Sequence, residues 1–220
     1  MDCQKDFNLF LIDYTKAFDR VMHEKLMEVL AKAGIPSHER RLVCEIYWNQ
    51  SAKVRLISET TEDIMIQRGV RQGCILSPSL FNLYSEYLLQ EAISEKSGIL
   101  INGVNISNIR YATVILAESE EQLEAMLDRI VYKCKEYGME INAKKTKTIH
   151  IGRDIKTLTI AVETAVFEQV SKYSYLGHMI TEDVATLLRY KYGLKRQGKS
   201  FGRTKSCYEG TLVSILRKES

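Results

Sequence analysis

The stretch FNLFLIDYTKAFD, residues Phe7–Asp19, decides the fold of this 220-residue chain. Its first part is a continuous apolar run that ends at Asp13, which predicts a buried β-strand that delivers a carboxylate to a surface. Carboxylate oxygens at the end of a strand suit Mg²⁺, because hard cations prefer oxygen ligands. The same aspartate could instead cap the following turn of the chain. This stretch alone therefore leaves both interpretations open.

A second stretch, RGVRQGCILSP at residues 68–78, predicts a polar loop that leads into a helix. Gly69 and Gly73 allow the backbone to approach another molecule closely, and Gln72 offers an amide. Pro78 suits the first turn of a helix. Such a loop can lie against a nucleotide or a template strand, although a simple turn built on glycines would show the same pattern.

Hydrophobic periodicity and turn residues predict strands interleaved with helices along the rest of the chain. Helices are expected at 23–33, 37–48, 78–96 and from a capping box at 119–122 to Gly138, and strands at 7–13, 53–57, 64–67, 106–117, 146–151, 158–162 and 173–180. In the second helix, Ser37 is the expected cap, and Leu42, Val43, Ile46 and Tyr47 are expected to face inward. The mixture predicts an α+β fold with a mainly antiparallel sheet.

Composition argues against several classes of protein. With 45% hydrophobic and 27% charged residues, the chain resembles a folded domain and not a disordered or fibrous one. No apolar run is long enough to cross a membrane, and the charged N-terminal residues argue against a signal peptide, so an intracellular location, nuclear or cytoplasmic, is expected. The five cysteines are scattered without a C-x-x-C pair, which argues against a zinc site or a disulfide framework.

Four stretches together resemble the reverse transcriptases of non-LTR (LINE-type) retrotransposons. FLIDYTKAFDRV is similar to motif A, RGVRQGCILSPSLFNLY to motif B, GMEINAKKTK to motif D and YSYLGHMIT to motif E, in the family's order over about residues 7–182. The resemblance implies the palm of a right-hand polymerase, a small antiparallel sheet backed by helices. It also implies catalysis by two Mg²⁺ ions, RNA-templated DNA synthesis as the ancestral activity, and an RNA template and a DNA primer as partners. We expect the fingers to be absent and the thumb to be absent or vestigial.

The resemblance also implies roles for residues of motifs A and B. Asp13, with the carbonyl of Tyr14 beside it, corresponds to the metal ligand of motif A. Phe18 corresponds to a gate that excludes a ribose 2′-hydroxyl, although it could equally fill the core. Gln72 and Gly73 correspond to positions along the incoming deoxynucleotide and the template.

Motifs D and E imply two further sets of roles. Lys145 corresponds to the lysine near the leaving pyrophosphate, or it is simply a solvated charge. Tyr175, Leu176 and Gly177 correspond to the turn that grips the primer end, or they form a plain hairpin corner. The residues leave open whether this chain itself binds nucleic acid.

Motif C is where the chain departs from the family. The family pattern Y-x-D-D followed by T-V-x-L-A corresponds here to RYATVILA, in which both aspartates between Ala112 and Thr113 are missing. No Asp or Glu lies between Gly98 and Ala117, so Asp13 is left as the one carboxylate of a site that needs two or three. Because metal positioning supplies nearly all of phosphoryl-transfer catalysis, we predict that this copy is catalytically inactive.

The missing residues also affect the backbone. Since Tyr111-Ala112-Thr113 contains no Gly, Asn or Asp for a tight turn, we expect Ile109–Ala117 to form one longer strand, with any turn moved back to Ser107-Asn108. Magnesium binding is accordingly expected to be weak or lost.

The charge is distributed unevenly along the chain. Residues 183–220 carry nine Lys and Arg against three Asp and Glu, a net charge of +6. Residues 1–182 carry a net charge of −3, so the whole chain has a net charge of +3. We divide the chain into a palm at 1–152, motif E strands at 153–182 and a basic tail at 183–220, which we interpret as out of frame. Three alternatives to a decayed enzyme stay open: a noncatalytic nucleic-acid- or protein-binding module on a palm scaffold, a degraded pseudogene product, and a live element with an assembly error.

Overall fold

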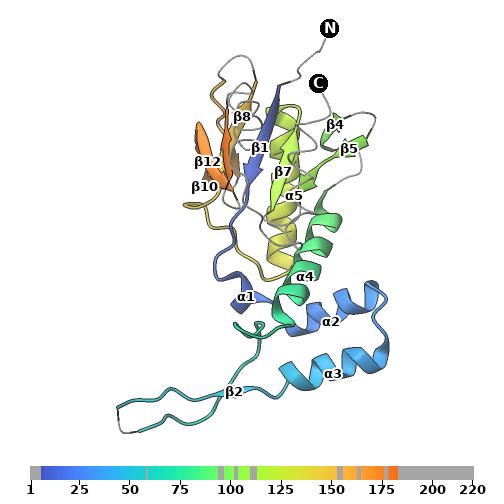
Figure 1. Cartoon of the computed structure of the whole chain (residues 1–220), viewed down its shortest axis with the longest axis vertical. Coiled ribbons are helices and arrows are strands. Elements are labelled where there is room, and N and C mark those ends of the chain that lie inside the picture. The colour runs from blue at the N-terminus through green and yellow to red at the C-terminus, as the bar shows by residue number, and fades with distance from the viewer. Residues whose placement is uncertain are drawn as a thin grey trace, which may run out of the picture. The chain divides into compact units, whose positions relative to one another are not determined.

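A computed structural model gives the structure of the chain and describes residues 6–57, 59–93, 97–101, 104–109, 113–152, 156–162, 165–175 and 178–182. The chain divides into two compact units (Figure 1). Unit 1 comprises residues 1–13, 93–129 and 141–220, and unit 2 comprises residues 14–92 and 130–140. Among the helices of the described ranges, none combines the length and the apolar character needed to cross a membrane.

Unit 1 is built on a five-stranded sheet with the strand order β11-β8-β1-β7-β6 (Figure 1). β1 (Phe7–Leu11) lies at the centre and pairs antiparallel with β7 (Val114–Ala117) and with β8 (Lys147–Ile151). β6 (Asn108–Ile109) pairs antiparallel with β7, and β11 (Glu168–Gln169) pairs parallel with β8. The predicted mainly antiparallel sheet is therefore confirmed, and the apolar run of the opening stretch is its central strand.

Alternation along β1 separates two buried faces of this sheet. Leu9 and Leu11 belong to an apolar cluster whose other members are Ile99, Val114, Leu116, Ile149, Ile151 and Ile180. Phe10 points the other way and packs edge-to-face against Phe167, with ring centroids 4.8 Å apart. Because both faces are buried, β1 is apolar at consecutive positions instead of alternating with polar residues.

Smaller hairpins complete the described part of unit 1. The paired strands are β4 (Ile99–Ile101) with β5 (Val104–Ile106), β9 (Ala161–Val162) with β10 (Ala165–Val166), and β12 (Lys172–Tyr175) with β13 (His178–Thr181). The strand expected at 173–180 is thus two strands that pair with each other. Residues 183–220, the expected basic tail, lie outside the described residues.

The prediction of one longer strand at Ile109–Ala117 is wrong. Asn108 lies opposite Ile115 and Ile109 lies opposite Val114 in an antiparallel pair, so the chain reverses between Ile109 and Val114. The physical reason is that β1 occupies one edge of β7, and the reversal lets β6 satisfy backbone hydrogen-bonding groups along the other edge of this buried strand. Residues 110–112 lie outside the described residues.

Four helices lie close to their predicted positions. They are α2 (His23–Lys32), α3 (Ser37–Tyr47) and α4 (Ser77–Ala92) of unit 2, and α5 (Glu120–Glu136), which begins in unit 1 and ends in unit 2. The short helix α1 (Ala17–Arg20) of unit 2 was not predicted. The capping box of α5 is present, since the Gln122 amide donates to Ser119 Oγ at 3.2 Å. The Gln122 side chain accepts from the Glu118 amide, one residue earlier than the expected Ser119.

Two expectations about α3 are wrong. Leu42 and Ile46 are 58% and 37% exposed, and Tyr47 is the buried residue of this helix. Ser37 makes no capping hydrogen bond, and Pro36 takes the N-cap position. The periodicity identified an apolar face correctly, but periodicity does not tell whether another element covers that face. A hairpin follows, as predicted, but its first strand is misplaced: β2 (Ser51–Ala52) lies before the range expected at 53–57, and β3 (Ile64–Met65) covers half of the range expected at 64–67. Both strands are exposed.

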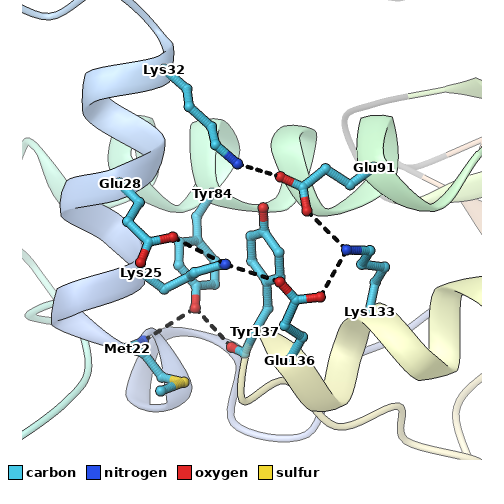
Figure 2. A network of polar contacts seen from close by, with 9 residues as sticks. All are labelled: Met22, Lys25, Glu28, Lys32, Tyr84, Glu91, Lys133, Glu136 and Tyr137. Atoms are coloured by element: carbon cyan, nitrogen blue, oxygen red, sulfur yellow. Dashed lines mark hydrogen bonds and ion pairs between the residues drawn. The ribbon is translucent and has the colours of Figure 1, made fainter.

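Lysines and glutamates in alternation tie α2, α4 and α5 together within unit 2 (Figure 2). Glu91 of α4 accepts from Lys32 at 2.7 Å and from Lys133 at 3.2 Å. Glu136 accepts from Lys133 at 2.7 Å and from Lys25 at 3.0 Å. A network of this kind contributes more to stability than isolated surface pairs, because each side chain is already held by its other neighbour.

A buried tyrosine makes a second connection beside this network (Figure 2). The Tyr84 hydroxyl donates to the Tyr137 carbonyl at 2.7 Å and accepts from the Met22 amide at 3.4 Å. Burial raises the pKa of Tyr84 to about 12, so the hydroxyl stays neutral and available as a donor at physiological pH. Helix α4 is thus joined to the residue that follows the motif A stretch and to the residue that precedes the motif D stretch.

Glu91 makes the stability of unit 2 depend on pH. Burial alone raises the pKa of its carboxyl, but hydrogen bonds from Lys32 and Lys133 outweigh burial and lower that pKa from 4.5 to about 2. A group whose pKa is lowered on folding stabilises the fold above its unfolded pKa, and this contribution is lost as the pH falls through the folded value. We expect Glu91→Gln to cost about 1–2 kcal/mol at neutral pH after solvent screening, and less than half of that at about pH 3.

Urea unfolding of the unmodified chain and of Glu91→Gln, from neutral pH to about pH 3, measures this difference in stability. Glu28→Gln serves as the control, because Glu28 is an end member of the network and its side chain is 57% exposed. A constant difference between Glu91→Gln and the unmodified chain from neutral pH to about pH 3 would contradict the prediction.

Candidate active site

Asp13 follows the end of β1 and is fixed through its backbone within unit 1. Its amide donates to Thr146 Oγ1 at 3.1 Å, and its carbonyl accepts from the Asn142 amide at 2.8 Å. The preceding Ile12 amide donates to the Thr113 carbonyl at 2.8 Å. The segment before β8 and the residue that follows the motif C deletion therefore hold Asp13 from two sides. Its side chain is 42% exposed, so the strand delivers a carboxylate to the surface as predicted.

Lys145 lies beside Asp13 in unit 1. It lies in the turn before β8, where its amide donates to the Asn142 carbonyl at 3.1 Å. Its Nζ is 3.9 Å from Asp13 Oδ2, and its side chain is 72% exposed. An ion pair this exposed contributes little to stability. The ion pair matters instead for the charge of the site. The ammonium group of Lys145 lies next to the carboxylate that would bind a divalent ion, and it neutralises part of the negative charge of that carboxylate.

The residues of this site do not fit a pair of magnesium ions. Within the described ranges, no three His, Cys, Asp or Glu side chains lie together where they could hold a metal ion. The sequence lacks both motif C aspartates, and the carboxylate that follows β1, Asp13, has Lys145 as its neighbour. Two divalent ions at close range need several carboxylates to balance their charge.

Phe18 lies on α1, in unit 2, and packs against an aromatic residue of α4. The rings of Phe18 and Phe81 are stacked with centroids 5.0 Å apart and an interplanar angle of 27°. The turn that leads into α1 contains Lys16 in the left-handed region, with φ 48°, the one non-glycine residue with a positive φ among those described. Such backbone conformations concentrate at functional sites.

Gln72 and Gly73 lie on the motif B loop, also in unit 2. The Gln72 amide nitrogen donates to Asp19 Oδ1 at 3.3 Å, so motif B contacts motif A through side chains. Gly73 has φ 86°, and a Cβ at this position would meet nothing within 4 Å. Glycine is therefore required here by the backbone conformation, and the space beside it is open.

The remaining predicted positions are only partly covered by the described residues. Tyr14 belongs to unit 2, where its hydroxyl is buried and hydrogen-bonds the Cys134 thiol. Burial raises the pKa of this thiol to about 12. Tyr175 ends β12 and pairs with His178, so the chain reverses at the expected primer-grip turn. Leu176 and Gly177 themselves lie outside the described residues.

Three residues of motifs A and B were missed in the sequence. Asp19 and Phe81 contact the two side chains assigned to nucleotide recognition. Cys74 is the third, because hydrogen bonds from the amides of Leu76 and Ser77, at the start of α4, lower the pKa of its thiol. The motif strings contain all three, but only the folded loop shows which side chains they contact.

A comparison with solved structures supports a polymerase palm. The structure of apo telomerase from Candida tropicalis, truncated from its C-terminal domain, matches 80% of this chain and 34% of that chain with a TM-score of 0.54 and 18% identity. At this identity the likeness concerns the fold alone. The fold is the mixed α/β palm of telomerase and reverse transcriptases.

Residues 4–180 match the family described as reverse transcriptase (RNA-dependent DNA polymerase), so the chain belongs to the reverse transcriptase family. Within it, the chain is of the non-LTR retrotransposon type. It is 32% identical over 162 residues to the retrovirus-related Pol polyprotein of the type-1 retrotransposable element R2 from Nasonia vitripennis. It is 27% identical over 177 residues to that of the type-2 element R2DM from Drosophila melanogaster.

These matches cover 73% and 76% of this chain but 16% and 17% of the two polyproteins. The chain therefore corresponds to about a sixth of the length of these relatives. The family generally uses divalent metal ions.

Proposed function

We propose that this chain is a reverse transcriptase domain that has lost nucleotidyl transfer while it keeps the nucleotide-facing side chains of motifs A and B. The proposal rests on the residues at the end of β1, where Asp13 faces the ammonium group of Lys145, and on the absence of both motif C aspartates from the sequence. Charge stabilisation by metal ions is the main source of phosphoryl-transfer catalysis, and a single carboxylate cannot organise it.

The motif B loop and α1 supply the retained part of the proposed function. Phe18 is proposed as the gate toward the 2′ position of the sugar, and Gln72 and Gly73 as the surface for the incoming nucleotide and the template. Their support is local: Phe18 is stacked, Gln72 is oriented by Asp19, and the space beside Gly73 is open. Lys145, in unit 1, is proposed from the family resemblance alone as the lysine near the leaving pyrophosphate.

Several finer assignments stay proposals beside this one. The RNA template and DNA primer are proposed partners by family membership, and an intracellular location is proposed for the same reason. Tyr175, Leu176 and Gly177 are proposed as the primer-grip turn, and Tyr14 as the carbonyl neighbour of Asp13. The boundaries at 152 and 182 and the out-of-frame tail also stay predictions.

The second candidate function is a noncatalytic binding module on the same scaffold. The exposed lysines of the turn before β8, Lys144 and Lys145, favour a nucleic-acid ligand. Binding to phosphates releases counterions, so affinity for RNA should fall steeply with salt. If the affinity of the chain for RNA does not change with salt, a protein partner is favoured over a nucleic-acid ligand.

Primer extension on an RNA template tests the loss of activity. We expect no extension by the unmodified chain, and measurable magnesium-dependent extension after two aspartates are inserted between Ala112 and Thr113. A matched version with two inserted asparagines separates the charge from the added length. Extension by the unmodified chain at a rate comparable to that of the aspartate version would contradict the proposal.

A further inference from the structure

We propose that Phe81 is a positioning residue for Phe18: by stacking on the Phe18 ring, it sets the discrimination between deoxyribonucleotides and ribonucleotides. The inference rests on the proposed function, because it takes Phe18 as the side chain that meets the sugar. Phe81 lies outside the residues that the motifs marked as nucleotide contacts, and its place in the argument comes from the contacts of α1, the motif B loop and α4 within unit 2.

The backbone around Phe18 is held in place by the motif B loop. The Phe18 carbonyl accepts from the Val70 amide at 2.8 Å, and the Val21 carbonyl accepts from the Gly69 amide at 2.7 Å. A Cβ on Gly69 would lie 3.1 Å from the Asp19 Cα, so glycine is what permits the two backbones to lie this close. The Cα of Phe18 is thereby fixed relative to the loop that carries Gln72.

A fixed backbone leaves the direction of the Phe18 ring to be decided by its side-chain contacts. The ring is half-buried, and its aromatic neighbour is Phe81, with stacked rings at 5.0 Å. Phe81 is itself anchored, because it lies on α4 between the buried residues Leu80 and Tyr84. A stacked aromatic pair of this kind favours one ring position over alternatives by about two- to tenfold beyond the area it buries.

This contact matters for selectivity because a steric gate discriminates only while it stays in place. A ring that can rotate aside accommodates a 2′-hydroxyl at little cost, while binding of a deoxyribonucleotide changes little. Loss of the Phe81 ring should therefore weaken discrimination more than it weakens binding of the deoxyribonucleotide. A merely structural role would lower both affinities together.

The first measurement follows the Phe18 ring directly. Phe18 is replaced by 4-fluorophenylalanine in the full chain, and its ¹⁹F signal is recorded with and without Phe81→Leu. Leucine keeps an apolar side chain on α4 but removes the ring. We expect the ¹⁹F signal to move toward its position in the urea-unfolded chain. Phe167→Leu is the matched control, because it breaks the other aromatic pair, Phe10–Phe167, in unit 1 and should leave the signal in place.

The second measurement is equilibrium dialysis with dGTP and GTP. We expect the unmodified chain to prefer dGTP, Phe18→Val to abolish the preference, and Phe81→Leu to reduce it by about three- to tenfold while the affinity for dGTP changes less. The role of Phe81 alone would be overturned if Phe81→Leu left the ¹⁹F signal of Phe18 unchanged. It would also be overturned if Phe81→Leu kept the full preference for dGTP while Phe18→Val lost it. If the unmodified chain binds neither nucleotide, or Phe18→Val leaves the preference intact, the proposed nucleotide site falls and the inference falls with it.

Discussion

Mn²⁺ should bind about a thousandfold more tightly once two aspartates are inserted between Ala112 and Thr113, because each added carboxylate near the ion contributes roughly 2 kcal/mol even at the dielectric constant of water. The hairpin needed to place them is already present, since β6 and β7 pair antiparallel on either side of the insertion point. β7 also lies next to β1, at whose end Asp13 stands, so the new carboxylates would enter close to the existing one.

Electron paramagnetic resonance of Mn²⁺ measures this binding without any requirement for polymerase activity. The version with two inserted asparagines is the control, because it has the same chain length and turn composition without the charge. We expect it to resemble the unmodified chain. Equal binding by the asparagine and aspartate versions, or tight binding by the unmodified chain, would show that the missing carboxylates are not what separates this chain from a metal-dependent enzyme.

Gly98→Ala should destabilise unit 1 by more than about 3 kcal/mol, because overpacking against the backbone and strain at a positive φ are among the few mechanisms that cause losses this large. Gly98 has φ 121°, and a Cβ would lie 2.5 Å from the Ile106 carbonyl oxygen and 2.7 Å from the Ser107 Cα. Both are backbone atoms that cannot rotate away. Ile106 is the partner of Ile99 in the β4–β5 hairpin, and Ile99 belongs to the apolar cluster of the sheet, so the clash would disturb the core directly.

Gly34→Ala is the matched control for this prediction. Gly34 also has a positive φ, 78°, but a Cβ there would meet nothing within 4 Å. The cost should therefore be limited to backbone strain of about 1 kcal/mol. Guanidinium unfolding followed by circular dichroism compares the two. If both alanine substitutions lower the free energy of unfolding by the same amount, the backbone of Gly98 does not lie as close to Ile106 as described.

Much of the fold could be predicted from local patterns. The apolar run of β1, the glycine and proline before and within the helices, and the capping box at Ser119 are all local, and the elements that they predicted are present. The errors concern a chain reversal between Ile109 and Val114 that no turn residue indicates, and the exposure of predicted inward faces. Leu42 and Ile46 are apolar at helical spacing yet exposed, because the spacing says nothing about a neighbouring element.

The candidate site divides in the same way. The amino-acid sequence alone shows that both motif C aspartates are missing and that Asp13 remains, because the presence or absence of a carboxylate is a property of the residues themselves. The folded structure is needed to see that the chain still reverses there, that Lys145 faces Asp13 and that Phe81 stacks on Phe18. The reversal is local but contains no turn residue that would indicate it, and the other two contacts join residues distant in the chain. The approach of such distant residues is set by the register of buried strands and the packing of helices.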